Sequence, residues 1–377
     1  MTGRERLERM IDNLPVDRVA LATLVDDITR SQMAPEWRDI PVLEFYRKLG
    51  YDHLQFGNYG LPQELRFIPP YTIRKGYTTE TKKRGDITID RRIMDGESLE
   101  IHMKLSHPVK YPVTTEEELE LMCRMMESEE VVEKTGAELE ESLASYYRVD
   151  AAIGDMGIYV PTVKQSGVQH LLEYECGVEN FYYLLEDNPE LVERAIESIQ
   201  RQRQKIYELL AKHIPCKTII PVENTSTSLI SPSLYRKYTL PHMQKYAQTM
   251  HQYGKKAIIH MCGHLGALLP ELKEIGLDGI HALTEPPVGT CTYEMALDAL
   301  GDDLVVFTGF NAGIMQDPYK TLEEKRQCIK DTLRPRILAG NFSFGAGADG
   351  RVTPIEHFEL IRDAVLEFGQ KEPFAKG

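Results

Sequence analysis

The chain has 377 residues, 42% of them hydrophobic, and its 44 basic and 58 acidic side chains give a formal net charge of −14 at pH 7. No Lys/Arg-rich run is present, so binding to nucleic acid or to an anionic membrane surface lacks its electrostatic basis. The sequence has neither a signal-peptide-like start nor an apolar run of 18 residues, which predicts a cytoplasmic protein with no membrane partner.

The cysteine pattern excludes a disulfide framework. Six cysteines are scattered along the chain without any C-x-x-C pair, so most are expected to be reduced and structural. Cys262 is the exception, because His260 precedes it at a spacing suited to metal binding.

The first elements in chain order alternate between helix and strand. Residues 4–13 are expected to form a short amphipathic helix, 19–24 a strand, 41–49 a helix that Gly50 ends, and 52–57 a second strand. Residues 58–112 then show β-branched and aromatic alternation without a helical period. We expect this segment to be a small antiparallel β insertion that covers one end of the fold, either as a decoration or as part of a substrate lid.

The rest of the chain settles into a regular strand–helix alternation. Helices are expected at 115–127 (with a capping-box start), 129–146, 178–185, 188–213, 231–253, 265–275, 293–300, 321–338 and 354–368. Further strands are expected at 151–155, 218–222, 257–260, 278–282, 304–308 and 341–344. Eight strands alternating with helices predict a single-domain TIM (β/α)8 barrel over residues 1–377, with a doubly wound open sheet as the alternative.

Polar residues follow most of the predicted strands. Chemistry in a barrel of this kind lies at the carboxyl ends of the strands, although any such rim is also polar because it is wet. The residues at these ends are Asp155, Glu223, Asn224, His260, Cys262, His281, Glu285, Thr308, Asn311 and Asp349.

The centre of this ring is the pair His260 and Cys262. Side chains two residues apart on a strand share a face, and both are good ligands for zinc. Glu223 ends the preceding strand, so a metal or acid/base centre across two adjacent strand ends is expected. The alternatives are a hydrogen-bonded core histidine and a cysteine that acts as a small buried hydrophobe.

Several motifs together resemble the uroporphyrinogen decarboxylase superfamily. The most specific is the H-x-C-G pattern at 260–263, and the other segments are 231–235, Leu240-Pro241, 309–312, 353–358 and 17–19. The resemblance implies a TIM barrel with its site at the carboxyl ends of the strands. True decarboxylases carry an arginine-rich loop after the first strand, whereas residues 26–33 here are acidic with the single arginine Arg30, which disfavours that reaction.

The H-x-C-G pattern is similar to that of the corrinoid-dependent methyltransferase branch. In that branch zinc is held by the histidine, the cysteine and a second cysteine near the last strand, but here that loop reads Gly345-Ala346-Gly347. The H-x-C-G pattern without this second cysteine resembles the methyltransferase component of anaerobic O-demethylases. Glu223 then supplies the third zinc ligand or acts as an acid.

The resemblance implies transfer of a methyl group from a small methoxylated, aromatic substrate to the Co(I) corrinoid of a separate corrinoid-binding protein. The expected catalytic residues are Glu223, Asn224 and Glu285, and the expected metal ligands are His260, Cys262 and Glu223. The residues expected to bind substrate are Asp155, His281, Thr308, Asn311 and Asp349. The alternatives are a zinc-dependent methylcorrinoid:thiol methyltransferase, a uroporphyrinogen decarboxylase and a non-catalytic tetrapyrrole-binding module.

Overall fold

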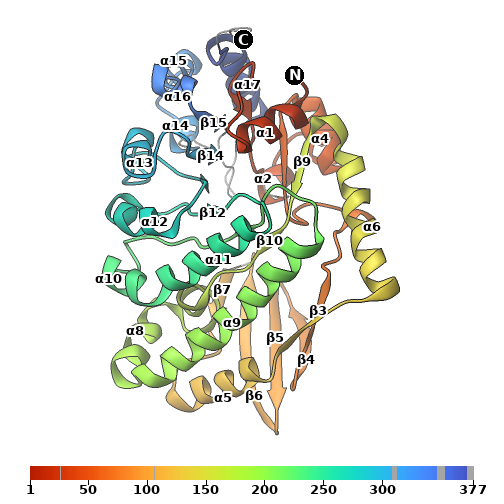
Figure 1. The fold of residues 1–377 in the computed structure, drawn as a ribbon, viewed down its shortest axis with the longest axis vertical. Coiled ribbons are helices and arrows are strands. Elements are labelled where there is room, and N and C mark those ends of the chain that lie inside the picture. Colours follow the sequence, from red (N-terminus) through yellow and green to blue (C-terminus); the bar gives the residue numbers. More distant parts are fainter. Residues whose placement is uncertain (26, 106, 308–311, 346–352, 372–377) are drawn as a thin grey trace.

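The protein is built on a run of parallel strands (Figure 1). A computed structural model describes residues 1–377 except 26, 106, 308–311, 346–352 and 372–377. Strand β2 pairs with β9, β10 pairs with β11, a bridge from Val222 to His260 joins β11 to β12, and the order then runs β12-β13-β14-β15-β1. The bounds are β1 (Ala20–Leu21), β2 (His53–Phe56), β9 (Gly157–Val160), β10 (Thr162–Val163), β11 (Ile220–Pro221), β12 (Ile258–His260), β13 (Gly279–His281), β14 (Val305–Phe307) and β15 (Asn341–Phe344).

A separate apolar cluster lies among these strands. Its buried side chains come from α1 (Gly3–Ile11), Val16 and strands or strand ends at both extremes of the run: Leu7, Met10, Ile11, Val16, Ala20, Ala22, Leu54, Ile158, Val160, Ile220, Ile258, Val305 and Phe307. Strands from both extremes share one interior when a parallel sheet rolls up. Among the described residues no ladder joins β1 to β2, so the fold is mixed α/β and consistent with a TIM barrel, while closure stays a prediction.

A larger core packs the strands against the helices. The long helices are α4 (Val42–Leu49), α5 (Glu116–Glu127), α6 (Gly136–Ile153), α8 (Gly177–Asp187), α9 (Pro189–His213), α11 (Leu240–Gln252), α12 (Leu269–Ile275), α13 (Tyr293–Leu300), α15 (Leu322–Thr332) and α17 (Ile355–Phe368). The short ones are α2 (Asp27–Ser31), α3 (Pro35–Arg38), α7 (Gly167–His170), α10 (Pro232–Leu234), α14 (Ala312–Gln316) and α16 (Pro335–Ala339). Within the described part of the chain, none combines the length and apolar character needed to cross a bilayer.

The expected antiparallel segment is confirmed as two small sheets. Strands β4 (Thr78–Arg84), β5 (Ile87–Met94), β6 (Glu97–Lys104) and β7 (His107–Lys110) form one, and β3 (Tyr71–Arg74) pairs with β8 (Glu130–Glu133) in the other. We call β3 to β7 the β insertion. It lies below the parallel strands in Figure 1, away from the two chain termini.

A buried ion pair fixes the β insertion to the main body. Arg92 on β5 donates to both carboxylate oxygens of Glu175, at 3.1 and 2.5 Å, and His170 lies 3.3 Å from the same carboxylate. Burial works against ionisation of Glu175, but the charge of Arg92 and the hydrogen bond from His170 outweigh it and lower its pKa to about 2. Glu175 is therefore ionised at neutral pH and holds the insertion in place.

Three expected elements are wrong. Residues 151–153 continue α6, and Gly154–Met156 form a 3-10 turn, because the apolar positions of this stretch follow the helical period of α6. The strand begins at Gly157 instead. The helix expected at 129–146 starts only at Gly136, after β8, and the one expected at 321–338 is divided into α15 and α16 just before Pro335, which favours a new helix start.

Candidate functional site at the strand ends

Three predicted site residues lie on adjacent strand ends. His260 ends β12 and is in register with His281, which ends β13. Val222 bridges to His260 from the other side, so the next residue, Glu223, follows at the same end. The backbone N–H of Glu223 donates to the carbonyl of His260 at 3.0 Å. The structure therefore brings Glu223, His260 and His281 to one edge, as the parallel pattern predicts.

The two histidines form a hydrogen-bonded pair. Their Nδ1 atoms are 2.7 Å apart, and the ring of Phe56 stacks on His281 with centroids 4.9 Å apart. Burial lowers the pKa of His260 to about 4, and burial together with the neighbouring His260 lowers the pKa of His281 well below its ordinary value of 6.5. Both rings are therefore neutral at pH 7, with one Nδ1–H donating to the other Nδ1. This bond leaves Nε2 of His260 to interact with other groups.

Glu223 is enclosed and bonded to Ser166. The backbone N–H and the hydroxyl of Ser166 donate to its two carboxylate oxygens at 2.6 and 2.8 Å, and the side chain has no exposed surface. Burial raises the pKa of Glu223 from 4.5 to about 7, against the opposing effect of the bonds from Ser166. Glu223 can therefore hold a proton near neutral pH.

Glu223→Gln is expected to flatten the pH dependence of stability. In the unfolded chain Glu223 ionises near 4.5, whereas in the folded chain it keeps its proton up to about 7. Because the folded state binds the extra proton, the free energy of unfolding falls as pH rises from 4.5 to 7. The loss from this residue is roughly 3 kcal/mol, at about 1.4 kcal/mol per unit of pKa. Urea denaturation at pH 4.5 and pH 8 measures it.

The matched control is Glu64→Gln, which removes a carboxylate from the short 3-10 turn Gln63–Leu65, where Glu64 is exposed. It should keep the wild-type pH dependence. Equal slopes in the wild type and in Glu223→Gln would contradict the raised pKa.

Asn224 and Cys262 lie beside this centre. Asn224 has a left-handed backbone with φ of 49°, a conformation that costs free energy for most residues and that asparagine tolerates. Cys262 is exposed, and its thiol donates to Oδ1 of Asn224 at 3.7 Å. Glu173 accepts bonds from Gln165 and Gln169 at 2.6 and 2.7 Å, and its pKa is raised by burial. Glu223 at its strand end and Glu173 in the turn Leu171–Glu175 are thus two carboxyl groups with raised pKa values.

The predicted zinc ligands do not converge as a ready-made site. His260 and Cys262 offer nitrogen and sulfur donors of the type that zinc uses, and His281 could orient His260 as an outer partner. Both oxygens of Glu223 accept a hydrogen bond from Ser166, and burial favours the protonated form, which is a weaker metal ligand than the carboxylate. Within the described ranges, no group of three or more His, Cys, Asp or Glu side chains is arranged to hold a metal ion. Zinc binding by His260, Cys262 and Glu223 stays a prediction.

Two other predicted residues lie elsewhere. Asp155 is in the 3-10 turn that precedes β9, at the amino end of that strand, so its expected position at a carboxyl end is wrong. Glu285 accepts from Arg334 and from the backbone N–H of Tyr293, both at 3.0 Å. These bonds tie Glu285 to α13 and α16, and its catalytic role stays a prediction. Thr308, Asn311 and Asp349 lie outside the described residues.

Sequence reasoning missed Ser166 and Phe56. Ser166 follows β10, and the strand preceding it was expected at 151–155; the apolar run Ile158–Val163 was the signal that could have located it. Phe56 ends a correctly predicted strand, and its alternation with Leu54 could have indicated an inward position. Ser166 contacts Glu223 and Phe56 contacts His281, but neither residue belongs to a recognisable sequence motif.

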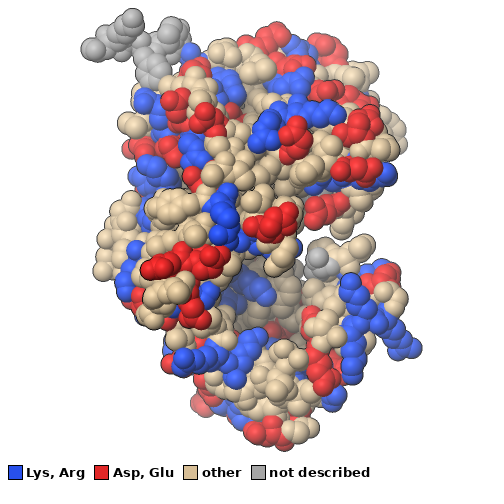
Figure 2. Space-filling view, turned by 90° about the vertical axis from the view of Figure 1, so that its right-hand side faces the viewer, with Lys and Arg blue, Asp and Glu red and all other residues tan. Residues whose placement is uncertain are grey.

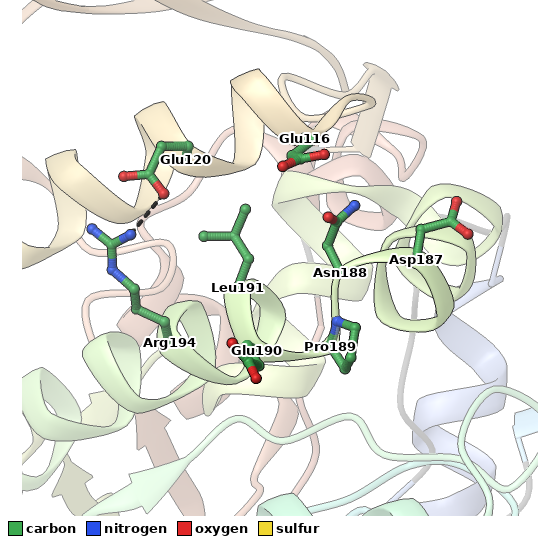
Figure 3. Close-up of a pocket in the computed structure, with 8 residues that line it drawn as sticks. All are labelled: Glu116, Glu120, Asp187, Asn188, Pro189, Glu190, Leu191 and Arg194. Carbon is green, nitrogen blue, oxygen red and sulfur yellow. Dashed lines mark hydrogen bonds and ion pairs between the residues drawn. The ribbon is translucent and has the colours of Figure 1, made fainter.

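A hollow on the surface between α5, α8 and α9 is distinct from the candidate site at the strand ends. It is lined by residues of α5 and of the junction between α8 and α9, among them Glu116, Glu120, Asp187 and Glu190, with Arg194 paired to Glu120 at 2.7 Å (Figure 3). None of its lining residues follows a parallel strand, and its carboxylates have no neighbouring nucleophile or histidine within this lining. We interpret it as a solvated acidic surface.

Comparison with known proteins finds a protein family that matches the part of the chain with the candidate site. Residues 170–341 match the uroporphyrinogen decarboxylase (URO-D) family, which confirms the resemblance seen in the sequence. Glu223, His260, Cys262, His281 and Glu285 all lie within this range.

Two methyltransferases from one organism are similar to this chain. The chain is 23% identical over 205 residues to the methylated-thiol–coenzyme M methyltransferase of Methanosarcina mazei, an alignment that covers 52% of this chain and 53% of that protein. The chain thus spans about half the length of this curated relative. A solved methyltransferase structure from Methanosarcina mazei shares the fold, with a TM-score of 0.59, 14% identity and coverage of 98% of this chain and 99% of that one.

Proposed function

We propose that this protein is a methyltransferase that moves a methyl group from a small methoxylated, aromatic substrate to the Co(I) corrinoid of a separate protein. One observation carries the proposal: a region that matches the URO-D family, in a chain with methyltransferase relatives, contains the histidine pair His260 and His281 at adjacent strand ends. A closed TIM barrel, whose mouth would admit both the substrate and the corrinoid protein, is part of the proposal.

The reaction breaks the bond between the methyl carbon and the ether oxygen. The reduced corrinoid of the partner supplies the electron pair for the new bond to carbon. The ether oxygen keeps the pair of the broken bond and takes up a proton to become a phenol. A phenol, with a pKa of about 10, leaves more easily than an aliphatic alcohol, which favours an aryl ether.

The chain's residues prepare this step by position and proton supply. Neutral His260, oriented by His281, can donate or accept through Nε2 at the leaving oxygen. Glu223 holds a proton near pH 7 next to Ser166 and serves as a proton store beside the histidines. Asn224, strained and partly exposed, is placed to orient the substrate. No step described here depends on zinc.

A second candidate is a methyltransferase that acts on a thiol. Two observations favour it: the curated relative acts on a methylated thiol and coenzyme M by its name, and Cys262 is exposed near His260. In that case His260 and Cys262 would hold the zinc that activates the thiol.

An absorbance assay tests both candidates. The purified chain is mixed with a reduced corrinoid protein and with methoxybenzoate, methoxyphenol, methylamine or dimethyl sulfide in separate cuvettes. We expect the Co(I) band to be replaced by that of methyl-Co(III) only with a methoxyarene, and the phenol to appear in equal amount. Methylation by the sulfide alone would favour the thiol candidate, and no change with any donor would contradict methyl transfer.

A further inference from the structure

A cavity separates the β insertion from the main body. It has a volume of about 390 Å³, within the range of small-molecule sites. Its walls come from β3, β5 and β6 on one side and from α7, the π turn Leu171–Glu175 and α9 on the other. Figure 2 shows that this face of the molecule is hollowed between its upper and lower parts, with Lys and Arg atoms inside the hollow.

Two cations in this cavity have no ion-pair partner. Lys164 follows β10 and makes no hydrogen bond or salt bridge within the described residues. Arg203 on α9 is 7% exposed, and its guanidinium donates to the carbonyl of Gln165 and to Gln202, with no carboxylate among its partners. Lys75 adds a third cation, 5.2 Å from the ring of Tyr77. Lys164 and Lys75 reach solvent, whereas Arg203 is buried, and a buried guanidinium without a carboxylate partner is costly unless an anion offsets it.

The carboxylates of the same cavity are already engaged. Glu175 is bound by Arg92 and His170. Glu129 accepts from Tyr77 and from Gln202, and Asp90 accepts from Thr81 at 2.5 Å. The lining thus holds four cations and three carboxylates, and Arg92 is the cation paired with Glu175. The imidazole of His170 has a pKa lowered mainly by burial. The excess charge of the cavity is positive in a chain with a net charge of −14.

The charge environment of Lys164 and Arg203 agrees with a missing anion. Burial lowers the pKa of Arg203, and desolvation inside the cavity together with the charge of Arg203 lowers the pKa of Lys164, although its side chain reaches solvent. A bound anion would oppose both shifts. His170 supports the same view, because its Nδ1 is buried and makes no hydrogen bond in the described structure.

The remaining wall of the cavity is apolar and aromatic. Ile73, Ile101, Met103 and Met126 line it, together with Tyr174. Such a wall suits the hydrocarbon body of a ligand rather than an inorganic ion.

We propose that this cavity binds a small organic carboxylate, with its charged group between Lys164 and Arg203 and its apolar body against Ile101 and Met103. Two donors on separate elements can grip the two carboxylate oxygens, and charge-assisted bonds of this kind are stronger than neutral ones. Neither His260 nor His281 is among the residues that line this cavity, so the inference does not depend on the proposed methyl transfer.

Calorimetric titration with 4-methylbenzoate tests the proposal, because this acid has no methyl group on oxygen, nitrogen or sulfur to transfer. The neutral comparator is 4-methylbenzamide, which has nearly the same shape. We expect the acid to bind at pH 7 and the amide to bind at least about tenfold more weakly, the effect of losing a charge-assisted hydrogen bond. Equal affinity for the two compounds would overturn the proposal.

Three variants of the full chain locate the binding. Lys164→Met should weaken 4-methylbenzoate binding about tenfold. Lys83→Met, an exposed position on β4 outside the cavity, should leave it unchanged, and so should His260→Ala at the strand ends. Unchanged affinity in Lys164→Met, or loss of binding in His260→Ala, would overturn the assignment to this cavity.

Discussion

Asp52→Ala is expected to lower the free energy of unfolding by about 3–5 kcal/mol, because it removes the shared partner of buried charges. Asp52 is 3% exposed and accepts from Arg6 at 2.6 Å, from Arg18 at 2.8 Å and from the backbone of Leu21 at 2.8 Å. Arg6 is also 3% exposed. The variant leaves its guanidinium with Asp17 as its remaining carboxylate partner and with the carbonyl of Met1, in a place that water does not reach freely.

This network matters because it joins α1 to the first two parallel strands. Arg6 lies on α1 beside Leu7 and Met10, which belong to the interior apolar cluster, while Asp52 immediately precedes β2. Loosening the network therefore weakens both the ion pairs and the packing of α1 under the strands.

Urea denaturation followed by far-UV circular dichroism measures the effect. The matched control is Asp302→Ala, which removes an aspartate that also bonds an arginine, Arg336, but is 77% exposed. It should change the free energy of unfolding by less than about 1 kcal/mol. Similar losses in the two variants would show that burial does not set the contribution of Asp52.

The sequence predicted the elements whose signals are local. Gly50 ends α4 in a left-handed conformation, and Thr115 caps α5 with Glu118 in the expected reciprocal pair. The prediction of a strand at 151–155 was wrong because a short apolar run is compatible both with a strand and with the continuation of a helix. Which one forms is decided by the pairing of β9 with β2, a contact more than a hundred residues away in sequence.

The sequence predicted which residues lie at the candidate site, but it did not predict which side chains they bond to. The i, i+2 spacing predicted a pairing of His260 with Cys262, whereas the structure pairs His260 with His281 on the next strand. Glu223 was expected to face the metal, and it is instead bonded to Ser166. Lateral neighbours depend on the register between strands, which no periodicity within one strand encodes.

His260→Ala is expected to reduce methyl transfer by about a hundredfold or more, if the proposed function is right. The variant removes the group that ends β12 and the hydrogen-bond partner of His281, so both the donor at the leaving oxygen and the fixed geometry are lost. Rates of methyl-Co(III) formation with a methoxyarene under excess substrate measure the loss. Circular dichroism and the urea midpoint check that the variant is folded.

Two further variants separate a role in the reaction from a structural one. His251→Ala removes an exposed histidine that bonds Asp278 at 2.7 Å, at the amino end of β13 and so at the opposite end of the strand from His281, and it should keep the wild-type rate. His281→Phe keeps a ring next to Phe56 but removes the Nδ1 partner of His260. This variant should lower the rate of methyl transfer about 10- to 100-fold, a smaller loss than in His260→Ala. The ring of His260 remains at the substrate but loses the bond that orients it. A rate for His260→Ala within about threefold of the wild type would contradict a catalytic His260, since a group that stabilises the transition state cannot be removed so cheaply.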